Sequence, residues 1–256
     1  MNKIILGNVK ENLEHFITTD SDKSNDIKVL VCFTGLVRTI LETVENLRQN
    51  IFHKNYSVTL VFVTWEGENV EDFINCFPEA IIYHIPSISF HDDHFSEWKK
   101  NSIMHSSWIN TFGNNCNALF EYYRQIFLWK QASIIIEKYR YFDIFVRART
   151  DVKLTGQLLN SYYEKVNSNN IFFPNNPRAS FIGEIGCPDF IFLCKFSAFH
   201  YALTIVDFIN YLYNKYNIPV QPETIMHFHL LDKNIDLNYM DNQITIVRQV
   251  NFSKTS

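Results

Sequence analysis

The residues of this sequence best suited to chemistry are two arginines and an aspartate at alternate positions, Arg147, Arg149 and Asp151. They end a largely apolar stretch that begins at Asp143 and is typical of a β-strand. Because side chains alternate along a strand, all three point to one side. Two guanidiniums and a carboxylate are costly to bury without partners. A diphosphate with Mg²⁺ or Mn²⁺ would satisfy them, with the aspartate on the metal and the arginines on phosphate oxygens. An internal arginine–aspartate ion-pair network that closes the strand is the alternative.

Two earlier strand ends carry residues that suit the same ligand. The first strand ends in Thr34-Gly35 and Arg38 follows, so that a ligand could approach the backbone at the glycine and the arginine could reach a phosphate. The second strand ends in Thr64-Trp65-Glu66, and a flat ring beside a carboxylate suits a base or a ribose. An ordinary turn with a surface arginine and a tryptophan that caps the core are the alternatives. No P-loop and no Gly-x-Gly-x-x-Gly motif occurs.

A long apolar helix is predicted over 117–139, immediately before the strand that carries the arginine pair. A polar stripe with a period of seven residues begins at Arg124 and is typical of a solvated helix face. Lys130, which lies off this stripe, and Gln125 are the candidates on this helix for reaching inward to the ligand.

Apolar runs and helical spacing define the elements that must position these residues. The predicted strands cover 27–33, 58–64, 80–85, 143–149, 171–173, 189–193 and 244–247, and the predicted helices cover 36–47, 70–77, 117–139, 196–216 and 223–231. Strand–helix alternation through the first 150 residues implies right-handed βαβ units. The predicted fold class is therefore α/β, a single domain with a mostly parallel central sheet flanked by helices. Ligands of such sheets bind beyond the carboxyl ends of the strands, where the residues above lie.

Composition narrows the class of protein. The chain has 256 residues, of which 46% are hydrophobic and 20% charged, so it can bury a core. A net charge of −4 argues against nucleic acid as a partner. No apolar run approaches the roughly 18 residues of a membrane span, and the N-terminus does not read as a signal peptide. The five cysteines form no CxxC pair and the histidines lack a zinc signature, which favours a reduced, cytoplasmic protein.

Taken together, these motifs resemble bacterial glycosyltransferases of the GT-A type, and in particular the surface-polysaccharide enzymes of the WavE lipopolysaccharide-synthesis family. The likeness rests on the motif FTG-x-x-R, the strand end Thr64-Trp65-Glu66, the helix YYRQIFLWKQA and the motif FD-x-x-x-R-x-R-T-D. It covers roughly residues 27 to 235 and implies a GT-A-like, Rossmann-like sheet.

The resemblance implies a nucleotide-sugar seated over the first strands. The residues expected to bind it are Thr34, Gly35, Arg38, Thr64, Glu66, Gln125, Lys130, Arg147, Arg149 and Asp151. In GT-A enzymes an Asp-x-Asp motif at the end of the fourth strand holds a divalent metal, Mn²⁺ or Mg²⁺. Here Arg149-Thr150-Asp151 stands in that place, so that only Asp151 matches a metal ligand and metal dependence is left open. By order and spacing, Glu223 is similar to the general base of inverting members, and Asp189 to a residue that contacts the sugar or the acceptor.

The implied function is the transfer of a sugar, with inversion, from a nucleotide-diphosphate donor to a cell-surface polysaccharide or lipopolysaccharide acceptor. Peripheral association with a membrane is left open. We expect a polar N-terminal segment over 1–26, a nucleotide-sugar-binding half over 27–155 and an acceptor-binding half of the same domain over 156–256. A nucleotidyl or phosphoryl transferase, and a non-catalytic nucleotide-binding scaffold of the same fold, are the competing interpretations.

Overall fold

The computed structural model describes residues 4–6, 27–52, 56–89, 91, 93, 95–96, 116–158, 162–175, 187–217 and 222–247. Of the segment predicted over 1–26, only Ile4–Leu6 therefore lies inside the described residues. Among them, nine strands form one sheet in the order β1-β4-β3-β2-β5-β8-β7-β9-β6. The strands are β1 Ile4–Leu6, β2 Ile27–Thr34, β3 Tyr56–Trp65, β4 Ile81–Ile85, β5 Ile144–Ala148, β6 Val152–Leu154, β7 Asn170–Asn175, β8 Ile191–Cys194 and β9 Asp236–Ile246.

The first five strands of this order are parallel to one another, as strand–helix alternation predicts. Beyond β5 the sheet becomes mixed. Strand β8 is antiparallel to both β5 and β7, β9 is parallel to β7, and β6 is antiparallel to β9. Residues 27–155 and 156–256 thus contribute to one continuous sheet, which agrees with a single α/β domain.

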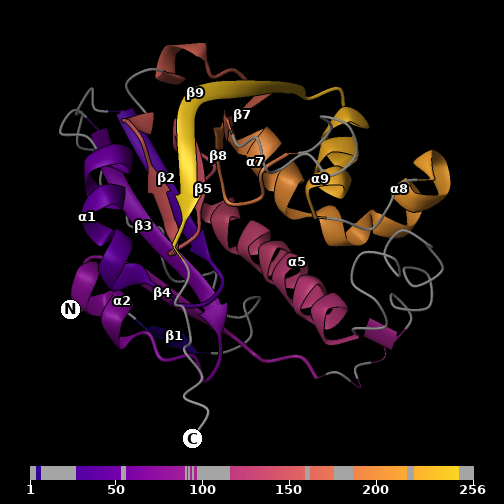
Figure 1. Ribbon diagram of the computed structural model, residues 1–256, viewed down its shortest axis with the longest axis horizontal. Helices are drawn as coiled ribbons and strands as arrows, with labels where there is room; N and C mark the ends of the chain where they lie inside the picture. The colour runs from indigo at the N-terminus through magenta and orange to yellow at the C-terminus, as the bar shows by residue number, and fades with distance from the viewer. Residues whose placement is uncertain are drawn as a thin grey trace, which may run out of the picture.

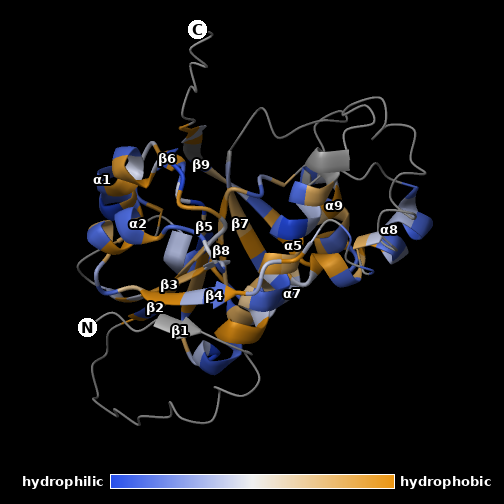
Figure 2. Ribbon diagram, turned by 90° about the horizontal axis from the view of Figure 1, so that it is seen from below, coloured by the Kyte–Doolittle hydropathy of each residue, from blue (hydrophilic) through white to orange (hydrophobic). Residues whose placement is uncertain are grey.

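Helices cover both faces of the sheet (Figure 1). They are α1 Ile40–Ile51, α2 Glu71–Cys76, α5 Cys116–Ile136, α7 Phe196–Leu203, α8 Ile209–Tyr216 and α9 Pro222–Leu231, with 3₁₀ turns at Glu137–Tyr139, Tyr163–Lys165 and Ile205–Asp207. Alternate residues of β2 belong to two separate cores. Val31 and Phe33 pack on the side of α1 and α2, whereas Leu30 and Cys32 pack on the side of α5, α7 and α9. The central strands show mostly hydrophobic residues between these helical layers (Figure 2).

The predicted helix over 196–216 is interrupted between α7 and α8. The hydroxyl of Thr204 donates a hydrogen bond to the carbonyl of Tyr201 at 2.8 Å, which competes with regular helical bonding. The first helix begins at Ile40 rather than at Leu36, because Thr150 and Glu68 hold the backbone of Leu36 and Val37 in the preceding loop.

Three further differences from the predicted elements concern strands. Strands β1 and β6 were not predicted, because a three-residue strand shows no periodicity; β1 lies in the segment expected to be polar and pairs with β4. Strand β9 is longer than the predicted 244–247, since its polar first half is held by pairing with β7 rather than by an apolar pattern. No helix in the described part of the chain is long and apolar enough to cross a membrane.

Candidate active site

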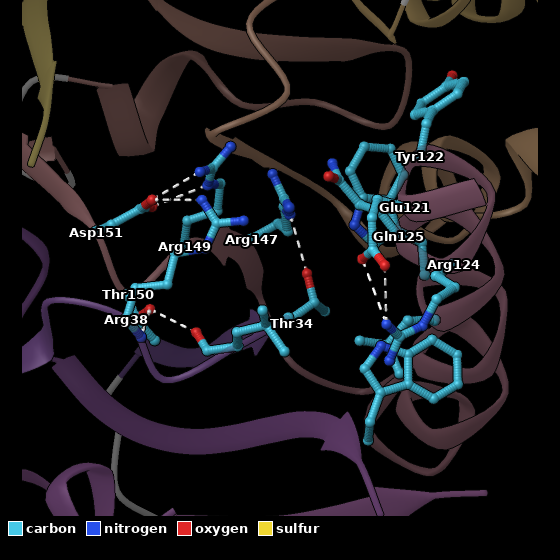
Figure 3. A pocket seen from close by; sticks show the side chains of 15 residues that line it. Thr34, Arg38, Glu121, Tyr122, Arg124, Gln125, Arg147, Arg149, Thr150 and Asp151 are labelled. Carbon is cyan, nitrogen blue, oxygen red and sulfur yellow. Dashed lines mark hydrogen bonds and ion pairs between the residues drawn. The ribbon is translucent and has the colours of Figure 1, made fainter. Parts of the chain in front are cut away.

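A cavity of about 270 Å³ opens at the carboxyl ends of β2, β3 and β5, against the N-terminal half of α5. Most of its polar side chains come from two places, the end of β5 and one side of α5 (Figure 3). The lining residues are Thr34, Gly35, Leu36, Arg38, Trp65, Glu121, Tyr122, Arg124, Gln125, Leu128, Trp129, Arg147, Arg149, Thr150 and Asp151. Seven of the residues predicted to bind the nucleotide-sugar therefore meet in one pocket: Thr34, Gly35, Arg38, Gln125, Arg147, Arg149 and Asp151.

The turn after β2 shapes the floor of the pocket. Gly35 has a φ of +116°, in the region that side chains rarely adopt. Its N–H donates to the carbonyl of Val63, and its carbonyl accepts a hydrogen bond from the hydroxyl of Thr64 at 2.7 Å. Thr64, which was predicted to bind the ligand, instead lies behind the turn and holds it in place.

Arg147 is the most unusual residue of the pocket, since it is only 1% exposed. Its Nε donates to the hydroxyl of Thr34 at 3.2 Å, and its guanidinium lies 4.6 Å from the centre of the Trp129 ring. Its Nη1 is buried and has no hydrogen-bond partner among the described residues. Burial lowers the pKa of Arg147 to about 10, although the charge of Asp189 opposes the change. A buried cation with an unused donor in a pocket wall indicates an anionic ligand.

Asp151 is held between two arginines. Arg149 donates from Nε to one carboxylate oxygen at 2.8 Å and from Nη2 to the other at 2.6 Å, which is a bidentate pair (Figure 3). Arg38 donates from Nη1 to the second oxygen at 3.0 Å. Burial raises the pKa of Asp151, but the two guanidiniums outweigh burial and hold it below the ordinary value. The ion-pair network that the sequence left as an alternative is therefore present.

Hydrogen bonds from three directions fix the backbone after β5. The hydroxyl of Thr150 donates to the carbonyl of Leu36 at 2.8 Å, and the carbonyl of Thr150 accepts from Thr43 of α1 at 2.5 Å. The carbonyl of Asp151 accepts from the N–H of Val247, beyond β9. The arginines are therefore presented by a rigid loop.

A divalent metal does not fit this donor set. Both oxygens of Asp151 are engaged by guanidiniums, and each of these would repel a cation. The other carboxylate of the pocket, Glu121, is paired with Arg124 at 3.1 Å. Among the described residues no group of three His, Cys, Asp or Glu side chains could hold a metal ion.

The two carboxyls predicted to be catalytic lie beside the pocket and near each other. Asp189 is 3% exposed and accepts a hydrogen bond from Nε2 of Gln125 at 2.5 Å. Burial raises the pKa of Glu223 to about 7, and the nearby charge of Asp189 adds to the rise. Pro222 begins α9, as its position before Glu223 predicts, and so places Glu223 in the first turn. Neither carboxyl is part of the pocket lining.

Besides Thr64, two predicted binding residues do not reach the pocket. Lys130 points away from it and pairs with Asp207 at 2.6 Å, with both side chains well exposed. Glu66 lies exposed after the end of β3 and is not part of the lining. Trp65 does line the cavity, but it is 4% exposed and lies 5.0 Å from the guanidinium of Arg124, so that most of the ring belongs to the core.

Sequence reasoning missed the aromatic members of the site on α5. Tyr122, Gln125 and Trp129 follow each other at intervals of three and four residues, and therefore share one helix face. That spacing is visible in the sequence, but the helix is apolar on most sides, so the face that meets a ligand does not stand out.

No family model matches the sequence, and no curated protein matches it. Among solved structures, the chain is similar to mouse xyloside xylosyltransferase 1 in its apo form, with a TM-score of 0.46, 12% identity, and coverage of 84% of this chain and 85% of that one. It is also similar to the apo form of the glycosyltransferase GlyE of Streptococcus pneumoniae TIGR4, with a TM-score of 0.42, 11% identity, and coverage of 85% of this chain and 46% of that one. A second GlyE structure gives a TM-score of 0.41, 10% identity and the same coverage.

The chain thus spans about half the length of GlyE. These solved structures are glycosyltransferases, but similarities at TM-scores this low assign no activity to the chain. Membership of the WavE family stays a prediction.

Proposed function

We propose that the protein is a glycosyltransferase that uses a nucleoside-diphosphate sugar as donor. The observation that carries this proposal is Arg147, a buried guanidinium with an unused Nη1 donor in the wall of a pocket at the carboxyl ends of parallel strands. Arg38 and Arg149 line the same pocket, so that an anion at the end of β5 meets three guanidiniums; the fourth arginine of the lining, Arg124, is paired with Glu121. A diphosphate, with several oxygens on two linked phosphorus atoms, is the ligand that suits several arginines at once.

The chemistry follows from this arrangement. In glycosyl transfer the bond between the anomeric carbon and the phosphate oxygen breaks, and its electron pair leaves with the diphosphate. The acceptor oxygen forms the new bond and gives up its proton. Guanidiniums aimed at the leaving oxygens stabilise the charge that develops there. Glu223, with a pKa near neutrality, accepts the proton, while Asp189 is held by Gln125 to contact the sugar or the acceptor.

A glycosidase suits the pocket less well. That reaction needs two carboxyl groups free to flank the scissile bond. The two carboxylates that line this pocket, Asp151 and Glu121, are each paired with arginine. The inverting course and the polysaccharide or lipopolysaccharide acceptor come from the sequence resemblance and complete the proposal.

The test is a thermal-shift screen of UDP, GDP, CDP, ADP and dTDP on the wild-type protein and on Arg147→Met. The methionine keeps apolar contact with Trp129 but removes the charge. We expect one nucleotide to stabilise the wild type, by about 2.7 kcal/mol at 100 times its Kd, and to have no effect on the variant. Without ligand, Arg147→Met should be as stable as the wild type or more so, because a buried unpaired charge is gone. Arg140→Gln, an exposed arginine outside the pocket, is the control.

The outcomes separate the alternatives. If no nucleotide stabilises the wild type, the donor proposal is wrong. If Arg147→Met unfolds while nucleotide binding persists in the folded remainder, Arg147 is structural. Release of the nucleoside diphosphate from the matching sugar donor, measured without acceptor, then distinguishes an enzyme from a protein that only binds the nucleotide.

A further inference from the structure

Both oxygens of the carboxylate at the end of β5 are already paired with guanidiniums. Asp151 is 1% exposed and accepts three hydrogen bonds, two from Arg149 and one from Arg38. A metal at this carboxylate would lie beside the guanidiniums of Arg38, Arg147 and Arg149. Like charges at such short range repel each other. The residues that line the pocket thus favour an anion over a cation.

We infer that the diphosphate in this pocket is held by Arg38, Arg147 and Arg149 without a divalent metal, and that Asp151 is the internal counter-charge that positions two of them. The inference rests on the proposed function, which supplies the diphosphate. It replaces the role of metal ligand that the sequence resemblance implies for Asp151.

The charges in the pocket match such a ligand. Three guanidiniums and the Asp151 carboxylate leave a net charge of about +2, and the diphosphate of a nucleotide-sugar carries about −2 at neutral pH. A bound metal would add two further positive charges. The arginines therefore supply the neutralisation that a divalent cation would otherwise provide.

The hydrogen-bond donors also suffice. A guanidinium has five N–H donors, and Arg149 uses two of them on Asp151. Arg38 uses Nη1 on the same carboxylate, and its side chain is 47% exposed, so that donors remain accessible to a ligand. Arg147 also lines the pocket, and its buried Nη1 has no partner among the described residues. A diphosphate can therefore bind without breaking the pairs with Asp151.

Asp151 is then needed for geometry rather than for metal binding. Arg149 is 14% exposed, and without a carboxylate its guanidinium would be repelled by the neighbouring Arg147. Pairing with Asp151 keeps Arg149 in the pocket wall before the ligand arrives, which lowers the cost of ordering it on binding.

Isothermal titration of the full chain tests this inference, with UDP, GDP, CDP, ADP, dTDP and inorganic pyrophosphate, first in EDTA and then in Mn²⁺ or Mg²⁺. We expect one nucleotide to bind in EDTA, with a Kd that changes by less than about threefold when metal is added. Binding that needs metal, or tightens more than about tenfold with it, overturns the inference and leaves the donor proposal standing. Pyrophosphate binding in EDTA with no nucleotide binding supports the metal-free cradle and overturns the donor proposal. No binding under any condition overturns both.

Asp151→Asn gives a second readout. If Asp151 is a counter-charge that positions Arg149, the variant loses melting temperature and binds the nucleotide more weakly, by the same factor in EDTA as in Mn²⁺ or Mg²⁺, because no metal takes part. If Asp151 is a metal ligand, the variant loses a metal-dependent gain in affinity, and the inference fails. Arg140→Gln again controls for a change of one surface charge. If Asp151→Asn does not fold, the comparison of wild type with and without metal decides alone.

Discussion

Replacement of Glu223 by glutamine should make the protein more stable and less active at the same time. Burial and the charge of Asp189 raise the pKa of Glu223 from 4.5 to about 7. Since the folded-state pKa lies above the unfolded-state value, the stability contributed by the protonated carboxyl is complete below pH 4.5 and is lost as pH rises to 7. At about 1.4 kcal/mol for each pH unit, the loss is about 3 kcal/mol.

Glutamine is neutral at every pH, so Glu223→Gln escapes this loss. At pH 8 we expect the variant to be more stable than the wild type by about 3 kcal/mol, which corresponds to a melting temperature about 6–10 °C higher. At pH 4.5 the two proteins should melt together. The rate of transfer should fall about 10²- to 10⁴-fold, because the general base is gone. The wild-type rate should rise with pH and level off above about pH 7.

Melting curves at pH 4.5 and pH 8, together with initial rates of nucleotide release from the donor, measure these effects. Glu71→Gln is a matched control, because Glu71 also lies in the first turn of a helix but is exposed. A difference in melting temperature that is equal at both pH values would refute the reasoning about the pKa. A Glu223→Gln variant that keeps more than about a tenth of the rate, while Asp189→Asn is inactive, would assign the base to Asp189.

Two further substitutions test whether Arg149 and Lys130 contribute to nucleotide binding. Arg149→Lys keeps the charge but loses the bidentate pair with Asp151. The melting temperature should therefore fall by a few degrees, and the nucleotide Kd should rise at least about tenfold. An unchanged Kd in titration calorimetry would make Arg149 purely structural. Lys130→Ala removes an exposed ion pair with Asp207, so that stability should change by less than about 1 kcal/mol and nucleotide affinity should not change. A loss of affinity in Lys130→Ala would mean that the lysine reaches the ligand, as the sequence suggested.

The fold could be predicted well where apolar pattern decides the structure. Strands β2, β3 and β5 are buried on both faces, so each is a continuous apolar run and is recognisable without its neighbours. Where tertiary contacts decide, the pattern fails. Strand β9 carries Asp241 and Asn238 and is extended because β7 and β6 pair with it. At the break between α7 and α8, the Thr204 hydroxyl bonds to the carbonyl of Tyr201 and a 3₁₀ turn follows, which the spacing of apolar residues does not report.

The sequence predicted that residues at the ends of β2 and β5 share one pocket, but not how their side chains pair. Alternation along β5 correctly places Arg147 and Arg149 on the side of the sheet that faces α5, since Phe145, at the same parity, packs in that core. Alternation cannot say whether the Asp151 side chain contacts a ligand or pairs with Arg149, because the backbone conformation is the same in both cases. The answer depends on Arg38, which is 113 residues away and donates to the same carboxylate. Arg149 stands where a GT-A enzyme has the first aspartate of its Asp-x-Asp motif. It is therefore one of the two arginines that neutralise the Asp151 carboxylate. A second positive charge at that strand end disfavours a cation there and favours an anion, as the proposed diphosphate requires.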